Sequence, residues 1–232
     1  SGLGWLQDGR LLIVQWNVRQ LVAHDSSGKL DVHANLSEHA PNGLNDMVVD
    51  SRTDTAYVGP IGFDFFAADP TISGTKLARV TPDGEVMMYG DGLVFTNGHA
   101  ISPDGDTLVV AETFGSQITA FDLDADGTPT NQRVWADFGA SPETDDLEEH
   151  IEAAVEAGLV MPDGIVFDAE GALWAADPFN HRAVRVHNGG EITDTVNYDK
   201  PVTATMLGGD DGRTLYLCAT PAIEGTAAMN AS

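Results

Sequence analysis

The chain has 232 residues, of which 42% are hydrophobic and 20% charged, a composition typical of a globular protein with one sizeable core. It carries 36 acidic and 11 basic residues, and the net charge of −25 argues against nucleic acid and anionic membranes as partners, since both require a basic surface. No stretch approaches the ~18 consecutive apolar residues of a transmembrane helix. The acids are spread along the chain, which favours solubility as their role, with attraction of cations as the alternative.

From the N-terminus onward one pattern recurs, in which an apolar strand, an Asp-Gly type of turn and a second apolar strand follow one another. Its five copies are SGLGWLQDGRLLIV (1–14), GLNDMVVDSRTDTAYVG (43–59), TNGHAISPDGDTLVVAE (96–112), MPDGIVFDAEGALWAAD (161–177) and TATMLGGDDGRTLYLCA (203–219). A second hairpin lies between successive copies, as in RVTPDGEVMMY (79–89). Such turns supply the positive φ that tight hairpins need, so one repeat is predicted to be four antiparallel strands.

Repeats of this kind and length are typical of β-propeller blades. The predicted blades are 1–40, 41–94, 95–160 and 161–200, and 201–219 is the first hairpin of a fifth. The expected fold is therefore an all-β propeller, one domain over 1–232 with about four and a half blades. Because a propeller closes its ring to protect its strand edges, this count predicts that the domain is incomplete at both ends.

Two insertions interrupt the blades. Residues 141–160 carry apolar side chains at spacings of three and four, which predicts an inserted amphipathic helix, either a wall over the propeller mouth or a surface decoration. Residues 60–74 are irregular and aromatic and could line a pocket.

The single cysteine, Cys218, excludes an intrachain disulfide. We expect its thiol to be buried and, from this weak redox signal, the protein to be cytoplasmic. The four tryptophans are expected in the core between blades.

Short polar insertions occur at the same place in successive repeats, where an inner strand begins. They are Asn45 with Asp46, Asn97, and Asp163. Amide and carboxylate oxygens that converge from different blades suit a hard cation such as Ca²⁺. The alternative is that each residue only makes a local turn by bonding nearby backbone groups.

The motifs FTNGHAISPDGDTLVVAET, MPDGIVFDAEGALWAAD and GLNDMVVDSRTDTAYVG resemble the blade openings of the SMP-30/gluconolactonase/LRE family, which includes regucalcin and calcium-dependent lactonases. The resemblance runs over nearly the whole chain. It implies a six-bladed propeller with a divalent metal on its axis, Ca²⁺ in the first place and Zn²⁺ or Mn²⁺ as alternatives. It also implies hydrolysis of sugar-acid lactones and related small esters.

The resemblance assigns roles to individual residues. It places the metal-binding Asn of the family at Asn97, and the metal-binding Asp that serves as general base at Asp163. It places a further Asn-Asp pair at Asn45, near metal or substrate, and Asp46. Two features depart from the family pattern: the first-blade Glu ligand is absent, because the chain begins at what resembles the second blade, and Gly43 stands where some members have a substrate-binding Arg.

The function expected from these residues is metal-dependent opening of a lactone ring, with Asp163 taking the proton from the attacking water. His99 lies two residues after Asn97 on the same strand, so it is a candidate substrate contact, with a filler of the central channel as the alternative. A non-catalytic binding scaffold and a truncated inactive relative are the competing functions. The oligomeric state is left open.

Overall fold

The computed structural model describes residues 2–222, and the remainder of the predicted domain 1–232 lies outside them. The first sheet contains β1 (Leu3–Trp5), β2 (Leu11–Gln15), β3 (Gln20–His24) and β4 (Leu30–Asn35). The second contains β5 (Leu44–Asp50), β6 (Thr55–Pro60), β7 (Gly74–Val80) and β8 (Val86–Val94). Both are antiparallel, and their strands pair in chain order, so each is a meander of two hairpins.

The remaining sheets repeat this arrangement. The third contains β9 (Thr96–Ile101), β10 (Thr107–Glu112), β11 (Gln117–Leu123) and β12 (Pro129–Asp137). The fourth contains β13 (Ile165–Phe167), β14 (Leu173–Asp177), β15 (Arg182–Val186) and β16 (Ile192–Asn197). A final hairpin contains β17 (Val202–Gly208) and β18 (Thr214–Ala219). The helices are η1 (Thr113–Gly115), α1 (Leu147–Glu156) and η2 (Pro178–Asn180).

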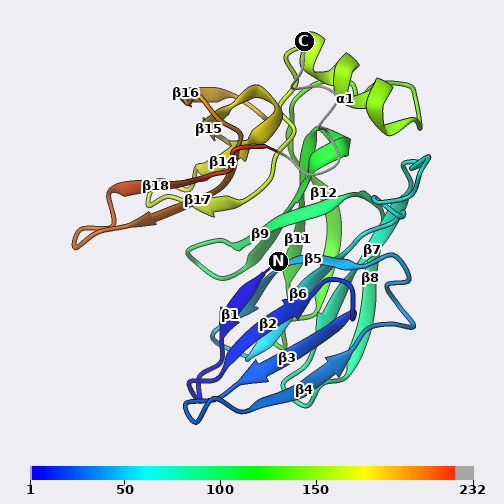
Figure 1. Ribbon diagram of the computed structural model, residues 1–232. Coiled ribbons are helices and arrows are strands. Elements are labelled where there is room, and N and C mark those ends of the chain that lie inside the picture. The colour runs from blue at the N-terminus through cyan, green and yellow to red at the C-terminus, as the bar shows by residue number, and fades with distance from the viewer. Residues whose placement is uncertain (1, 223–232) are drawn as a thin grey trace.

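The sheets succeed one another as blades, from the blue β1–β4 to the orange β17–β18 hairpin (Figure 1). Apolar clusters fill the spaces between neighbouring blades; for example, Leu12 and Leu21 of the first blade pack with Val58 and Ala78 of the second. The second, third and fourth blades are covered on both faces by their neighbours, which is why their strands read as apolar runs rather than as clean alternation. The prediction of an all-β propeller with four blades and a further hairpin is confirmed.

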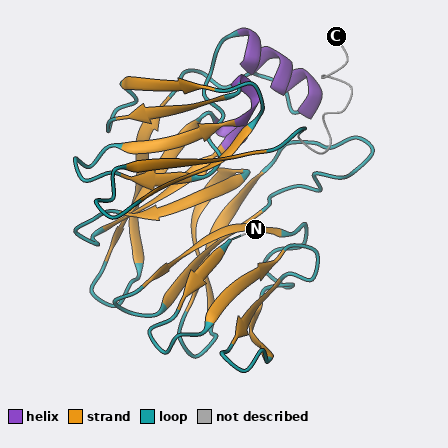
Figure 2. Cartoon of the chain, turned by 60° about the vertical axis from the view of Figure 1, so that its left-hand side comes forward, coloured by secondary structure: helices purple, strands orange, loops and turns teal. Residues whose placement is uncertain are grey.

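Helix α1 lies beyond the ends of the strands, at one edge of the blades (Figure 2). Its side chains Leu147, Ile151 and Ala154 are buried in a cluster with aromatic residues of the second and third blades. The helix is shorter than the predicted 141–160, because the side chain of Asp146 caps its first turn by accepting a hydrogen bond from Glu149 N at 2.9 Å. The residues before the cap are irregular, and Asp145 O accepts a hydrogen bond from Ile72 N at 2.8 Å.

Two sequence expectations differ from the structure. Cys218 is exposed rather than buried, because β18 is the outer strand of the last hairpin and no further strand of residues 2–222 pairs with it. Trp5 on β1 is also exposed, since β1 opens the first blade of the described chain and no described blade covers that face. Among residues 2–222, no helix combines the length and the apolar character needed to cross a membrane.

Candidate functional site

The inner strands of the blades are irregular where they approach the axis. In β5, three steps from Leu44 to Met47 face two steps on β6, so one extra residue is accommodated around Asn45 and Asp46. In β9, three steps from Thr96 to His99 face two on β10, which places a bulge around Asn97. A bulge breaks the alternation of a strand and redirects its side chains. These two bulges therefore decide which side chains the strands present near the axis.

The fourth and fifth blades have the same feature. Asp163 N donates to Ala176 O at 2.9 Å and Ala176 N donates to Gly164 O at 3.0 Å, so two residues oppose one. In β17 the pairing shifts between Val202 and Ala204, which places the irregularity at Thr203. Four successive blades thus present one bulged polar position each.

Backbone hydrogen bonds hold these positions from blade to blade. Gly98 N donates to Asp163 O at 3.1 Å, and Gly164 N donates to Thr203 O at 3.1 Å. A Cβ atom on Gly98 would lie 2.7 Å from Ile165 N, and one on Gly164 would lie 2.7 Å from the Cα of Ala204. Only glycine permits this approach, so the two glycines set the spacing between neighbouring site residues.

The amide of Asn45 has a fixed orientation. Its Nδ2 donates to the carbonyl oxygen of Thr96 at 3.0 Å, and a carbonyl can only accept, so the nitrogen must face that way. The hydroxyl of Thr96 donates in turn to Pro60 O at 2.7 Å. The Oδ1 of Asn45 is therefore left available at the cavity that Asn45 lines.

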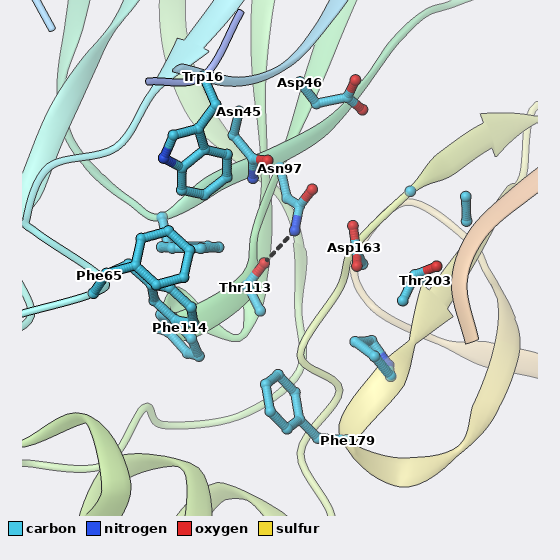
Figure 3. A pocket seen from close by; sticks show the side chains of 15 residues that line it. Trp16, Asn45, Asp46, Phe65, Asn97, Thr113, Phe114, Asp163, Phe179 and Thr203 are labelled. Carbon is cyan, nitrogen blue, oxygen red and sulfur yellow. Dashed lines mark hydrogen bonds between the residues drawn. The ribbon is translucent and has the colours of Figure 1, made fainter. Parts of the chain in front are cut away.

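The amide of Asn97 is oriented by a longer chain of bonds. Thr113 Oγ1 donates to Pro162 O at 2.9 Å, so this hydroxyl can only accept from its other neighbour. Asn97 Nδ2 supplies that bond at 3.2 Å. The Oδ1 of Asn97 then points into the same space as the carboxylate of Asp163 (Figure 3).

Asp163 and Asp46 are two carboxylates in one acidic region. Burial, reinforced by the charge of Asp46, raises the pKa of Asp163 to about 8. Burial also raises the pKa of Asp46. Among the described residues, neither carboxylate forms a salt bridge with Arg, Lys or His. Both ionised forms therefore lack a protein cation, and a bound cation would stabilise them.

These residues surround a cavity of about 430 Å³. Polar groups line one side, namely Asn45, Asp46, Asn97, Thr113, Asp163 and Thr203, and aromatic rings line the other (Figure 3). The part of the chain from 2 to 222 has no group of three or more His, Cys, Asp and Glu side chains placed to hold a metal. It does offer the free amide oxygens of Asn45 and Asn97 and the carboxylate of Asp163, which come from three blades. Such a set of neutral and anionic oxygen donors fits a hard divalent cation.

Two buried carboxylates fix the segments that lead into the site. Glu112, at the end of β10, accepts a hydrogen bond from Val94 N at 2.7 Å, just before the inner strand that carries Asn97. Asp177, at the end of β14, accepts one from Met161 N at 3.2 Å, just before Asp163. Asp177 is also paired with Arg182 at 2.7 Å. Both carboxylates therefore position the site residues rather than meeting solvent.

A comparison with models of known protein families shows to which family the chain belongs. A family model described as "SMP-30/Gluconolactonase/LRE-like region" matches residues 1–220. The chain belongs to this family. The family assignment agrees with the resemblance inferred from the blade-opening motifs.

Individual members of the SMP-30/gluconolactonase/LRE-like family share about a quarter of their aligned residues with this chain. A 6-deoxy-6-sulfogluconolactonase of Pseudomonas putida is 27% identical over 196 residues, which are 81% of this chain and 60% of that protein. The pentonolactonase XacC of Haloferax volcanii is 26% identical over 182 residues, 77% of this chain and 53% of that protein. The chain thus spans about half to three fifths of the length of these relatives.

A solved structure supports the fold of this family member. A calcium-binding protein, regucalcin, from Agrobacterium tumefaciens superimposes with a TM-score of 0.72 at 22% identity. The match covers 100% of this chain and 71% of that chain. At this identity the likeness concerns the propeller fold alone.

The structure brings most of the predicted site residues of this family member together. Asn45, Asp46, Asn97 and Asp163 all line the cavity. His99 does not line it, because the bulge in β9 separates its direction from that of Asn97. Its ring is buried and lies where a Cβ on Gly59 of β6 would touch it, and within residues 2–222 both ring nitrogens lack a hydrogen-bond partner. Burial lowers the pKa of His99 to about 3, so this ring is neutral.

Sequence reasoning missed several cavity residues. Thr203 occupies the same register position in the fifth blade as Asp163 in the fourth, and the repeat itself could have found it. Thr113 and Phe179 lie in the short helices after β10 and β14, and Trp16 follows β2, where no local pattern marks them. Phe65 and Phe66 lie in the aromatic insertion 60–74, which lines the pocket as expected.

Proposed function

We propose that this protein is a lactone-opening hydrolase that works with a divalent cation, Ca²⁺ in the first place, held by Asn45, Asn97 and Asp163. The observation that carries the proposal is the orientation of the two amides. Each nitrogen is engaged by the protein, so each oxygen is available at a cavity that also contains the Asp163 carboxylate, which forms no salt bridge with the described residues. Membership of the family and the names of the lactonase relatives support the same activity.

A divalent cation bound at such a site polarises a substrate carbonyl and makes a nearby water more acidic. The contribution of the chain is to orient the substrate and to move a proton. The carboxylate of Asp163 faces the amide oxygen of Asn97 in Figure 3, so we assign Asp163 the role of general base. The second acid, Asp46, raises the proton affinity of Asp163 and forms part of the substrate-binding wall.

The reaction adds one water to the ring ester. The water oxygen forms a bond with the carbonyl carbon, and Asp163 accepts the proton that this oxygen loses. The ring C–O bond then breaks, and the proton passes to the departing ring oxygen. The product is a hydroxy acid, and the Asp163 carboxylate is regenerated, so the step needs no oxidant or further reactant.

The test uses the full chain, treated with a chelator, and the variant Asp163→Ala. Cation binding is measured by calorimetry with Ca²⁺, Zn²⁺ and Mn²⁺, and hydrolysis is measured on a panel of lactones with each ion. We expect Asp163→Ala to lose cation binding and roughly 10²- to 10⁴-fold in kcat/KM. Asp199 is exposed and is not among the lining residues, so Asp199→Ala is the matched control that removes the same group outside the cavity lining.

Full hydrolysis by Asp163→Ala would contradict the role of this residue. Cation binding by the unaltered chain without turnover of any lactone would favour a non-catalytic scaffold or an inactive relative instead. These outcomes separate the enzyme from both competing functions.

A further inference from the structure

One wall of the cavity consists of aromatic rings, contributed by Trp16, Phe65, Phe66, Phe95, Phe114 and Phe179. The rings form a continuous surface. Phe95 lies 4.7 Å from Phe114, and Phe114 lies 6.2 Å from Phe179, measured between ring centroids. On the other flank, Phe65 contacts Phe66 edge-on at 5.2 Å, and Trp16 lies 5.8 Å from Phe66. These adjoining rings make one side of the cavity apolar.

This aromatic wall is supported from behind. The buried face of helix α1 packs against the same cluster, and the ring of His150 meets Phe114 edge-on at 5.9 Å. The insertion that carries Phe65 is tied to the start of the helix by the bridge between Thr71 and Asp146. Helix α1 thus packs behind the aromatic wall and supports it, so the rings are held in place before a ligand binds. A preformed apolar wall favours binding because little side-chain freedom remains to be lost.

The polar side of the cavity provides hydrogen-bond acceptors, namely the oxygens of Asn45, Asn97, Asp46 and Asp163, but few hydrogen-bond donors. The amide nitrogens of Asn45 and Asn97 and the hydroxyl of Thr113 donate to the protein itself. No Lys or Arg is among the described residues that line the cavity, whereas Asp46 and Asp163 are. Hydroxyl groups laid against the aromatic wall would lose their water without gaining hydrogen bonds, and an anionic substituent would face two acids.

We propose that the lactone taken by this site carries a neutral, apolar alkyl or aryl substituent, which lies against the aromatic wall while the ring ester faces Asn97 and Asp163. This inference rests on the proposed lactone-opening function. A cavity of about 430 Å³ has room for a five-membered ring and a chain of several carbons.

The experiment compares γ-butyrolactone and its γ-alkyl homologues up to γ-decalactone with glucono-1,5-lactone, in the full chain with Ca²⁺. Burial of each methylene should raise kcat/KM by about fourfold until the wall is covered. Glucono-1,5-lactone should be hydrolysed less efficiently than the alkyl lactones. Equal or better hydrolysis of glucono-1,5-lactone, or no dependence on chain length, would overturn the inference and leave lactone hydrolysis standing.

The variant Phe66→Ala tests whether the dependence of kcat/KM on chain length arises at the aromatic wall. Phe66 is 59% exposed, so Phe66→Ala should leave the fold intact while it shortens the apolar surface. We expect the ratio of kcat/KM between γ-decalactone and γ-butyrolactone to fall roughly five- to tenfold, since each 1.4 kcal/mol of lost contact corresponds to a factor of ten. Tyr198→Ala, an exposed aromatic outside the cavity lining, is the control and should leave the ratio unchanged. An unchanged ratio in Phe66→Ala would count against the wall as the binding surface.

A binding measurement separates this inference from the proposed activity. The γ-alkyl lactams have the shape of the lactones but resist hydrolysis, and calorimetry reports their affinity directly. If no lactone is hydrolysed but lactam affinity still rises with chain length, the proposed function fails and the ligand class stands. If lactam affinity is flat with chain length, the ligand class fails.

Discussion

The hydroxyl of Thr113 has a role that can be tested without any knowledge of the substrate. It donates to Pro162 O at 2.9 Å and accepts from Asn97 Nδ2 at 3.2 Å, and the side chain is 2% exposed. The variant Thr113→Val keeps the shape and removes the hydroxyl. It leaves two polar groups without their partner, one of them an enclosed carbonyl and the other an amide that can turn to the cavity.

The expected loss of stability in Thr113→Val depends on whether water can reach the two polar groups that lose their partner. An unpaired buried polar group costs about 1–3 kcal/mol, so the enclosed Pro162 carbonyl should account for about 2 kcal/mol of lost stability. The Asn97 amide loses the bond that fixes its orientation. Because partners of metal-binding side chains typically contribute ten- to hundredfold to affinity, cation affinity should fall by roughly that factor.

The assay combines urea unfolding in the presence of a chelator with calorimetric titration of Ca²⁺. Thr113→Ser retains the hydroxyl and is the matched control, with both quantities close to those of the original protein. If Thr113→Val unfolds at the same urea concentration and binds the cation equally well, the hydroxyl does not orient Asn97. The assignment of the free amide oxygen would then be wrong as well.

Two further predictions concern the carboxylate and the spacing of the blades. Folded Asp163 keeps its proton up to about pH 8, whereas the unfolded chain releases it near 3.8, so without a cation the free energy of unfolding should fall as pH rises. Because the lowered pKa of His99 opposes this slope only below about pH 6.5, the fall is measured by urea unfolding between pH 7 and 8. Gly98→Ala should destabilise the protein by about 1–3 kcal/mol or more, since its Cβ would lie 2.7 Å from Ile165 N.

Each of these predictions has its own control. Asp163→Asn should remove the slope between pH 7 and 8, and a slope that persists in this variant would assign it to another group. For the glycine, Gly208→Ala is the comparison, because its Cβ would approach only the edge of the Tyr216 ring, at 3.2 Å. Equal stability of Gly98→Ala and Gly208→Ala would show that the blades can separate at the axis without cost.

The blade openings show which site residues can be predicted from the local sequence and which cannot. Asn45, Asn97 and Asp163 stand at equivalent repeat positions, and this register was enough to predict that they converge. The direction of His99 could not be predicted in this way. Alternation along a strand would place it beside Asn97, but the bulge in β9 depends on how β9 pairs with β10, and pairing is not a property of either strand alone.

The sequence by itself determined the repeat, the four-stranded blades and the polar residues at the openings of the second, third and fourth blades, because tight turns and apolar strands are specified by neighbouring residues. Only the tertiary structure decided which atoms face the cavity. The amide oxygens of Asn45 and Asn97 are free because Thr96 and Thr113, from another strand or helix, occupy their nitrogens. The aromatic wall likewise gathers rings from separate blades, and helix α1 packs behind it. Such contacts join residues far apart in the chain, so they exist only once the blades have packed around the axis.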